Sequence, residues 1–297
     1  QLTRRQRQMC IRDRYGGTLS WLAADGTDEE QTDGIGSSEA IKMLDQFAIS
    51  ETPFFLAVGF FRPHTPFVAP KKYFDIYDRK KIEIPESSSE YLATLPEPAA
   101  KSIRAKKNQL NLEKERAQEI KEAYYATISF VDAQLGRILD YLEVSGLDKN
   151  TIVVFTSDHG YHMGEHGHWQ KQTLFENATR IPLIISTPNS EIKGVKSNSP
   201  VELIDLYPTL MDLTNINTPK HVVGKSLEPL MKNVNNSVRG SAITRWRNGY
   251  SIKTKRYRLT KWGSNGELGY ELYDHRYDKN ELINLAKNQD YNEVMDS

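Results

Sequence analysis

The 297-residue sequence contains a single cysteine, Cys10, and therefore cannot form an internal disulfide. This scarcity fits a cytosolic or bacterial periplasmic protein better than a disulfide-rich secreted one. Net charge is also missing, because 39 basic residues balance 39 acidic ones. Since binding to nucleic acid needs a concentrated basic surface, we predict no nucleic-acid partner. The longest apolar run, Phe54–Phe61, is too short to cross a bilayer, so we predict no membrane partner. The composition predicts an ordinary globular protein.

The composition and residue pattern of the sequence change twice, which predicts three regions. Residues 1–14 (QLTRRQRQMCIRDR) are rich in arginine and show no helical or strand periodicity, so we predict a foreign or disordered leader there and assign Cys10 no function. Residues 15–236 are predicted to form an α/β domain. Residues 237–297 are predicted to form a small C-terminal α+β subdomain.

Apolar patterns predict the fold class. Near-continuous apolar runs at Phe54–Phe60, Thr151–Phe155 and Pro182–Ser186 predict strands buried on both faces, as in a parallel sheet. Helical spacing predicts helices from Ser37 or Ser38 as N-cap, over Glu113–Leu142 and over Glu202–Leu213. This alternation predicts an α/β fold with a mainly parallel sheet flanked by helices. Four later stretches predict a small antiparallel sheet: Ser241–Trp246, Gly249–Lys253, Tyr257–Trp262 and Tyr270–Tyr273.

The segment Thr151–Lys171 (TIVVFTSDHGYHMGEHGHWQK) holds the strongest functional signal, because its apolar run stops at Asp158 and His159. Polar groups at the carboxyl end of such a strand lie where open α/β proteins bind ligands. Asp158 offers the hard oxygen that Ca²⁺ or Mg²⁺ prefers, while His159 keeps zinc or manganese open. A zinc centre is the alternative, built from four of the seven histidines: His159, His162, His166 and His168.

Two further residues complete a predicted anion site. Lys171 is the only cation that closes this loop, although a solvated surface lysine is the alternative interpretation. His64 lies between Pro63 and Pro66, in a stiff turn directly after another predicted strand, and a structural histidine is its alternative. A metal, a cation and a general acid around one group predict a site for an oxyanion ester.

These segments resemble the type I sulfatases of the alkaline phosphatase superfamily, most closely the iduronate-2-sulfatase-like branch. The resemblance lies in G-x-x-x-PH-x-P within FFLAVGFFRPHTPFVAP, in the helix KEAYYATISFVDAQLGRILDYL and in SDHG-x-x-x-GEHG-x-x-x-K. It covers the chain from about Ser37 to Leu285. It implies an alkaline-phosphatase-like α/β fold and hydrolysis of sulfate esters, with a sulfated sugar or oligosaccharide as substrate.

The resemblance also implies roles for particular residues. Asp158 and His159 would be metal ligands, for Ca²⁺ or else Mg²⁺ or another divalent ion. Lys171 and His64 would contact the sulfate, and His64 would protonate the leaving oxygen. Residues assigned to the substrate subsite by position are Tyr161, His162, Arg245 and Arg247.

The sequence departs from the family pattern on its amino-terminal side. The Cys/Ser-x-Pro-x-Arg motif, whose cysteine becomes the nucleophilic formylglycine, is not found, and in Cys10–Arg14 the proline position holds Arg12. We therefore expect a sulfatase fragment with little or no activity, from a protein that is periplasmic or secreted. Two alternatives stay open: a phosphodiesterase or phosphonate monoester hydrolase of the same superfamily, and a non-catalytic carbohydrate-binding remnant. The particular sulfated sugar and the oligomeric state are not predicted.

Overall fold

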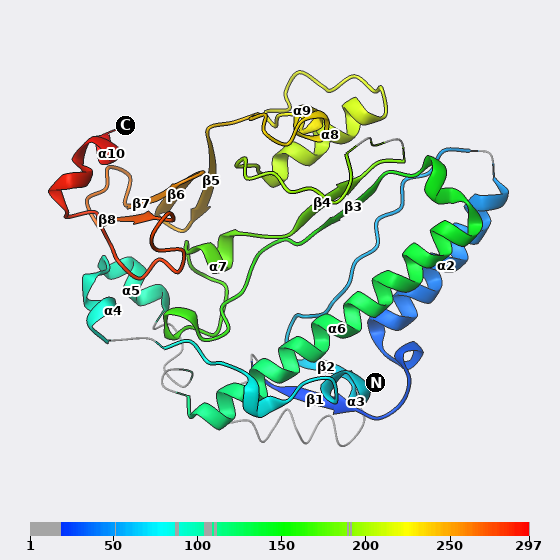
Figure 1. The fold of residues 1–297 in the computed structure, drawn as a ribbon, viewed down its shortest axis with the longest axis horizontal. Coiled ribbons are helices and arrows are strands. Elements are labelled where there is room, and N and C mark those ends of the chain that lie inside the picture. The colour runs from blue at the N-terminus through cyan, green and yellow to red at the C-terminus, as the bar shows by residue number, and fades with distance from the viewer. Residues whose placement is uncertain are drawn as a thin grey trace. The chain divides into compact units, whose positions relative to one another are not determined.

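The computed structural model of the chain describes residues 19–50, 52–86, 89–103, 109, 112–188, 190 and 192–296. The predicted leader over residues 1–14 lies outside these residues. The chain divides into two compact units, shown with their elements in Figure 1. The first comprises residues 1–85 and 106–153, and the second comprises residues 86–105 and 154–297. The division predicted after residue 236 remains a prediction. In the described segments, no helix combines the length and apolar character needed to cross a bilayer.

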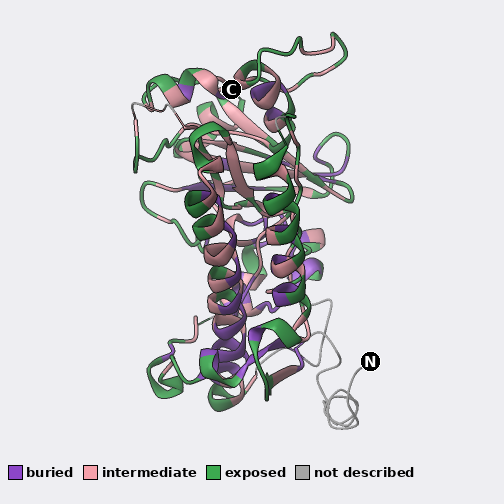
Figure 2. Ribbon diagram, turned by 90° about the vertical axis from the view of Figure 1, so that its right-hand side faces the viewer, coloured by how far each residue is buried: buried purple, intermediate pink, exposed green. Residues whose placement is uncertain are grey.

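Two long helices form the core of the first unit. Helix α2 (Thr32–Ile49) and helix α6 (Lys114–Ser145) lie side by side, and buried and exposed residues alternate around them (Figures 1 and 2). Their apolar faces meet at Leu44 and Ile138, among others. Helix α6 ends at Gly146, whose φ of 75° provides a left-handed cap that other residues adopt at a cost. The predicted helix over Glu113–Leu142 is therefore confirmed.

The predicted N-cap of the first helix is wrong. Helix α2 begins at Thr32, so that Ser37 and Ser38 lie inside it. Their hydroxyls donate to the carbonyls of Asp33 and Gly34, one turn earlier in the helix. Serine makes such local bonds within helices as well as at caps, and the sequence pattern alone did not separate the two cases.

A small parallel sheet accompanies these helices in the first unit. Strand β1 (Trp21–Ala24) pairs with strand β2 (Phe67–Pro70). The remaining elements of this unit are short: η1 (Asp28–Glu30), α3 (Lys71–Phe74), η2 (Arg79–Lys81) and η4 (Leu147–Asn150). The parallel pairing agrees with the predicted sheet type, although neither strand was predicted.

The predicted strand over Phe54–Phe60 does not form a ladder with any described residue. Leu56 and Val58 pack against the cluster between α2 and α6, whereas Phe55 is 83% exposed. This period of two is typical of an extended segment that covers helices with one face. The prediction of burial on both faces is therefore wrong for this segment.

The second unit contains the other two predicted strands. Strand β3 (Val153–Thr156) pairs with strand β4 (Leu183–Ser186), and in β4 the side chain of Ile184 is 59% exposed, so burial on both faces is wrong here also. The predicted helix at Glu202–Leu213 is confirmed as η6 (Leu203–Asp205) followed by α8 (Leu206–Leu213). Shorter elements are η5 (Glu165–Gly167), α7 (Glu176–Thr179) and α9 (Glu228–Lys232).

The C-terminal antiparallel sheet is confirmed in the second unit. Its strands follow chain order: β5 (Ser241–Trp246), β6 (Gly249–Thr254), β7 (Tyr257–Trp262) and β8 (Gly269–Asp274). One face packs on helices α4 (Ser89–Thr94) and α5 (Glu97–Ile103). Leu174 and Phe175, which precede α7, belong to the same apolar cluster as Trp262 and Tyr273 of the sheet. The chain continues through η7 (Gln289–Tyr291) to α10 (Asn292–Asp296).

Candidate functional site

Asp158 and His159 present two facing acceptor atoms just after β3. The His159 Nδ1 atom lies 2.8 Å from the carbonyl oxygen of Gly160, and because a carbonyl only accepts, Nδ1 carries the proton. The other ring nitrogen, Nε2, therefore offers a lone pair, and it lies 3.4 Å from Oδ2 of Asp158. The Asp158 side chain is 83% exposed, so it is open to a ligand. A carboxylate and a neutral imidazole arranged in this way fit two ligands of one divalent cation.

Gly160 fixes this pair to the following helix. Its N–H donates to the carbonyl of Ala178 at 2.8 Å, and a Cβ at this position would lie 2.1 Å from the carbonyl oxygen of Asn177. A larger residue would force the two backbones apart, which explains why glycine follows Asp158 and His159.

The other three histidines of the loop are buried, with exposures of 0% for His162, 1% for His166 and 3% for His168. His162 Nε2 lies 2.8 Å from the hydroxyl oxygen of Thr173, and the ring of His166 stacks on Phe175 with centroids 4.1 Å apart. Burial lowers the pKa of His162 well below its usual value and the pKa of His166 to about 4. The rings of His162 and His166 are therefore neutral packing groups near neutral pH.

Two predictions are corrected by this packing. A ring without exposed surface cannot face a substrate, so we remove His162 from the substrate subsite. The four-histidine zinc centre is also not supported. In the described part of the chain, one group of three side chains comes close enough to share an ion, and it contains none of these four histidines.

Lys171 and Tyr161 belong to the same loop as Asp158 and His159, residues 157–171, which we call the histidine loop. Both are partly buried. The Lys171 ammonium makes no ion pair with a carboxylate of the described residues, although Lys171 accepts a backbone bond from Thr173 through its carbonyl. An ammonium without a carboxylate partner is available to contact an anion. The Tyr161 hydroxyl donates to the carbonyl of Trp169 at 3.2 Å.

His64 occupies a turn of the first unit that other residues hold rigidly. The backbone N–H groups of Phe61 and Arg62 donate to the two carboxylate oxygens of Asp33, at 2.8 and 2.9 Å. The guanidinium of Arg62 in turn donates to the carbonyls of Val68 and His64. His64 is exposed, and its Nδ1 lies 2.7 Å from the Thr65 carbonyl, which leaves Nε2 for a ligand. That His64 shares one site with Asp158 and Lys171 remains a prediction.

Arg245 and Arg247 lie on the β5–β6 hairpin, and both side chains are exposed. The hairpin packs against the segment that follows Lys171, because a Cβ at Gly249 would lie 2.6 Å from Cδ1 of Leu174. The hairpin and the histidine loop therefore belong to one packed assembly within the second unit. Their contact with an acidic sugar is a proposal.

A buried ion network, which sequence analysis missed, joins α7 to the C-terminal sheet. The Arg258 guanidinium is 3% exposed and pairs with Glu176 and with Glu281, whose Oε1 lies 2.6 Å from Nε. His275 Nε2 lies 2.7 Å from the same oxygen of Glu281. Burial alone would raise the pKa of Glu281, but Arg258 and His275 together hold it below its usual value.

This network also accounts for the one described group that is close enough for a metal, Glu176, His275 and Glu281. The guanidinium of Arg258 already occupies the space between the two carboxylates and pairs with both. A cation there would have to displace it, so we assign no metal to this group.

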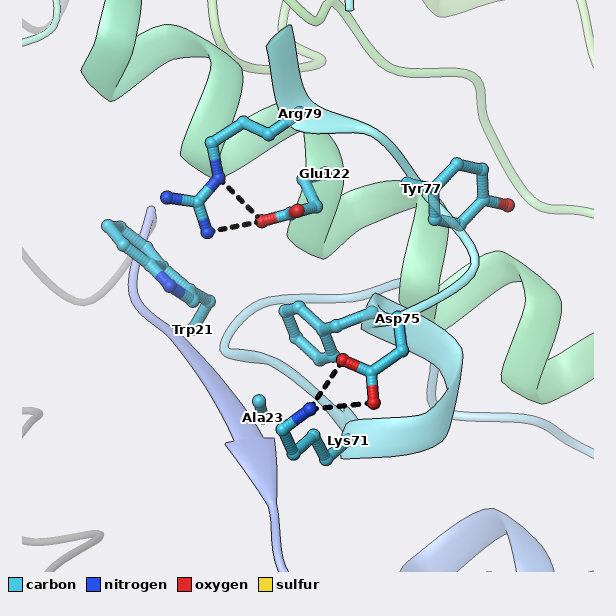
Figure 3. Close-up of a pocket in the computed structure, with 8 residues that line it drawn as sticks. Trp21, Ala23, Lys71, Asp75, Tyr77, Arg79 and Glu122 are labelled. Atoms are coloured by element: carbon cyan, nitrogen blue, oxygen red, sulfur yellow. Dashed lines mark hydrogen bonds and ion pairs between the residues drawn. The ribbon is translucent and has the colours of Figure 1, made fainter.

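Two pockets of the first unit lie elsewhere. A pocket of about 480 Å³ is lined by residues around Tyr77 and Lys121, and its neighbour of about 420 Å³ is drawn in Figure 3. In Figure 3 the two cations are paired with carboxylates, Lys71 with Asp75 and Arg79 with Glu122. Neither pocket contains a predicted site residue, and the paired charges leave no net attraction for an anion.

Comparison with known proteins identifies the class. The family model described as Sulfatase matches residues 15–216, and the model described as N-sulphoglucosamine sulphohydrolase, C-terminal, matches residues 164–297. The chain therefore belongs to the sulfatase family. The predicted resemblance is confirmed, and so is the α/β fold with a small C-terminal antiparallel sheet.

Three relatives show the extent of the similarity. A sulfatase of Formosa agariphila is 39% identical over 241 residues, covering 80% of this chain and 46% of that protein. The iduronate 2-sulfatase of Homo sapiens is 30% identical over 224 residues, covering 63% of this chain and 40% of that protein. The structure of a phosphonate monoester hydrolase from Silicibacter pomeroyi matches with a TM-score of 0.81 and 22% identity, covering 98% of this chain and 65% of that one, which shows the fold alone. The chain spans about half the length of these curated relatives.

Proposed function

We propose that the whole protein to which these residues belong hydrolyses sulfate esters of a sulfated carbohydrate, with Asp158 and His159 binding a divalent cation, Ca²⁺ in the first place. The observation that carries this proposal is the pair of facing acceptors, Asp158 Oδ2 and His159 Nε2, 3.4 Å apart. The ammonium of Lys171, which forms no ion pair with the described carboxylates, belongs to the same loop. Membership of the sulfatase family and relatives named for sulfated sugars, such as iduronate 2-sulfatase, support the choice of substrate class.

Each residue has a proposed role in this reaction. A bound cation would draw charge from the sulfate oxygens. Lys171 would offset the negative charge on the transferring group, and His64 would give a proton from Nε2 to the leaving oxygen. Tyr161, Arg245 and Arg247 would contact the acidic sugar around the ester.

The proposal includes the expected weakness of this polypeptide as an enzyme. These 297 residues contain no Cys/Ser-x-Pro-x-Arg motif, the source of the formylglycine nucleophile that the resemblance implies. We propose that the polypeptide by itself binds a sulfate ester and shows little or no turnover. The periplasmic or secreted location of the whole protein stays a prediction.

Calorimetric titration with CaCl₂ tests the metal pair. We expect one site in the unchanged chain, and binding at least about tenfold weaker in Asp158→Asn, because even outer partners of metal ligands are worth roughly ten- to hundredfold. Asp290→Asn removes an exposed carboxylate of the second unit and serves as the matched control. Equal Ca²⁺ affinity in Asp158→Asn and the control would refute the assignment.

A second titration separates the alternatives. In the presence of Ca²⁺ we expect a sulfated monosaccharide to bind more tightly than a phosphonate monoester, with binding lost on chelation. Preference for the phosphonate would favour a phosphonate monoester hydrolase. Sugar binding that is unchanged by a chelator would favour a carbohydrate-binding remnant.

A further inference from the structure

The C-terminal sheet carries a row of alternating cations and aromatic rings. Arg245 of β5 is paired with Tyr250 of β6, Tyr250 with Lys261 of β7, and Lys261 with Tyr270 of β8. Residues directly opposite one another in antiparallel strands project from the same face of the sheet. These four side chains therefore form one line across all four strands, which we call the cation–tyrosine row.

The row lies on the outer face of the sheet. Side chains of the inner face are buried, as Trp262 at 1% and Glu271 at 2% exposure illustrate. On the outer face Tyr270 is 36% exposed, and Ile243 and Ile252, which pair with each other beside the row, are 59% and 41% exposed. Arg245 and Tyr270 are exposed and Tyr250 and Lys261 are half-buried, so the row reaches solvent along its length.

The two cations of the row contact an aromatic ring and neutral oxygen atoms. The guanidinium carbon of Arg245 lies 5.2 Å and the Lys261 ammonium 5.8 Å from the ring centroid of Tyr250. Their hydrogen bonds go to neutral carbonyls, of Arg247 and Ser264. Neither cation pairs with a carboxylate in the described part of the chain. A positive, aromatic surface of this kind is complementary to an anionic ligand with apolar faces.

We propose that the cation–tyrosine row binds a chain of sulfated polysaccharide. Each cation would meet a sulfate group, and the Tyr270 ring would pack against the C–H face of a sugar ring, while the Tyr250 ring holds the two cations in place. Because neighbouring strands lie about 4.8 Å apart, Arg245 and Lys261 are separated by about 10 Å. That spacing is close to the length of a disaccharide unit, so sulfates on alternate sugars would meet successive cations. Duplex nucleic acid requires a more concentrated basic surface than this row offers.

The ligand class rests on the proposed function, but the row does not depend on the metal pair. The hairpin that carries Arg245 packs on Leu174, shortly after Lys171, so the row and the histidine loop share one compact unit. Polysaccharide held on the row would raise the local concentration of sulfate esters around that loop.

The experiment measures binding of chondroitin sulfate to the full chain with a chelator present. We expect the double variant Arg245→Ser with Lys261→Ser to bind at least about tenfold more weakly, with the salt dependence reduced by about two counterions. Tyr250→Ser with Tyr270→Ser should also weaken binding. Lys101→Ser with Lys232→Ser removes two exposed cations of the same unit and should change binding less than about twofold.

Three results would overturn the proposal. The first is equal weakening of binding by the row variant (Arg245→Ser with Lys261→Ser) and by the control variant (Lys101→Ser with Lys232→Ser). The others are equal affinity of the unchanged chain for desulfated chondroitin and equal affinity for duplex DNA. Thermal unfolding of each variant checks that the sheet still folds. Asp158→Asn separates this proposal from the proposed function. Loss of Ca²⁺ binding with chondroitin sulfate binding intact supports both, whereas Ca²⁺ binding that survives refutes the metal pair alone.

Discussion

Glu271→Gln provides a direct test of the electrostatics inside the C-terminal sheet. Glu271 is fully buried, and its two carboxylate oxygens accept hydrogen bonds from the Trp262 indole N–H at 2.6 Å and the Tyr273 hydroxyl at 2.9 Å. Burial raises the pKa of Glu271 from 4.5 to about 7, although both hydrogen bonds oppose the shift. Glutamine has the same shape as the protonated acid, and its amide can donate to the oxygen of Tyr273.

The sign and size of the effect follow from this shift. A carboxyl that binds its proton more tightly when folded contributes most stability below pH 4.5. That contribution falls as the pH rises from 4.5 to about 7 and is gone above it. The difference of 7 minus 4.5 is 2.5 pKa units, which corresponds to about 3 kcal/mol. Glu271→Gln never ionises, so we expect it to be about 3 kcal/mol more stable than the unchanged chain at pH 8, and nearly equal at pH 4.

Urea denaturation followed by tryptophan fluorescence at pH 4, 6 and 8 measures this difference. Other groups that titrate in the same range, the buried histidines among them, contribute equally to both proteins and cancel when the two are subtracted. Parallel stability profiles for the two proteins would show that Glu271 is already ionised without cost, and the reasoning would fail.

Two further predictions concern the supports of the candidate site. His166 has a pKa of about 4 when folded against 6.5 normally, so its contribution to stability is complete above pH 6.5 and is lost as the pH falls to 4, by about 3 kcal/mol. His166→Asn, which tolerates the φ of 58°, should remove that acid loss in urea denaturation, and an unchanged loss would contradict the assignment. Asp33→Asn keeps one acceptor for the N–H groups of Phe61 and Arg62 and leaves the other unsatisfied, so it should destabilise the chain by about 1–3 kcal/mol. Hydrogen exchange of those two amides should then become faster, and unchanged exchange would show that Asp33 does not hold the turn.

The sequence predicted the C-terminal sheet well because each strand there is short, β-prone and bounded by turn residues. Strands β1 (WLAA) and β2 (FVAP) were missed because neither has the run of β-branched residues that indicated β3 (VVFT) and β4 (LIIS). The run Phe54–Phe60 was predicted as a buried strand from composition, but composition does not reveal which face meets the helices.

The site was predicted in part. The order of polar residues after β3 predicted Asp158 and His159 as neighbouring candidate ligands, because residues close together in the sequence form a motif that can be read directly from it. It did not show that His162 is buried, because a histidine in a glycine-containing loop has the same local sequence whether its ring is buried or exposed. Arg258 lies 82 positions from Glu176 and 23 positions from Glu281 along the chain, so no local pattern indicates that these residues pair.

The buried network around Arg258 has a consequence for how such chains can be recombined. Glu176 follows the histidine loop, whereas Arg258 and Glu281 belong to the last strand pair and the segment after it. If the final sixty or so residues are exchanged for those of a relative without Arg258, Glu176 keeps its charge but loses its buried partner, which would destabilise the packing of α7 next to Asp158 and His159. The histidine loop and the C-terminal sheet should therefore come from the same parent in any chimaera.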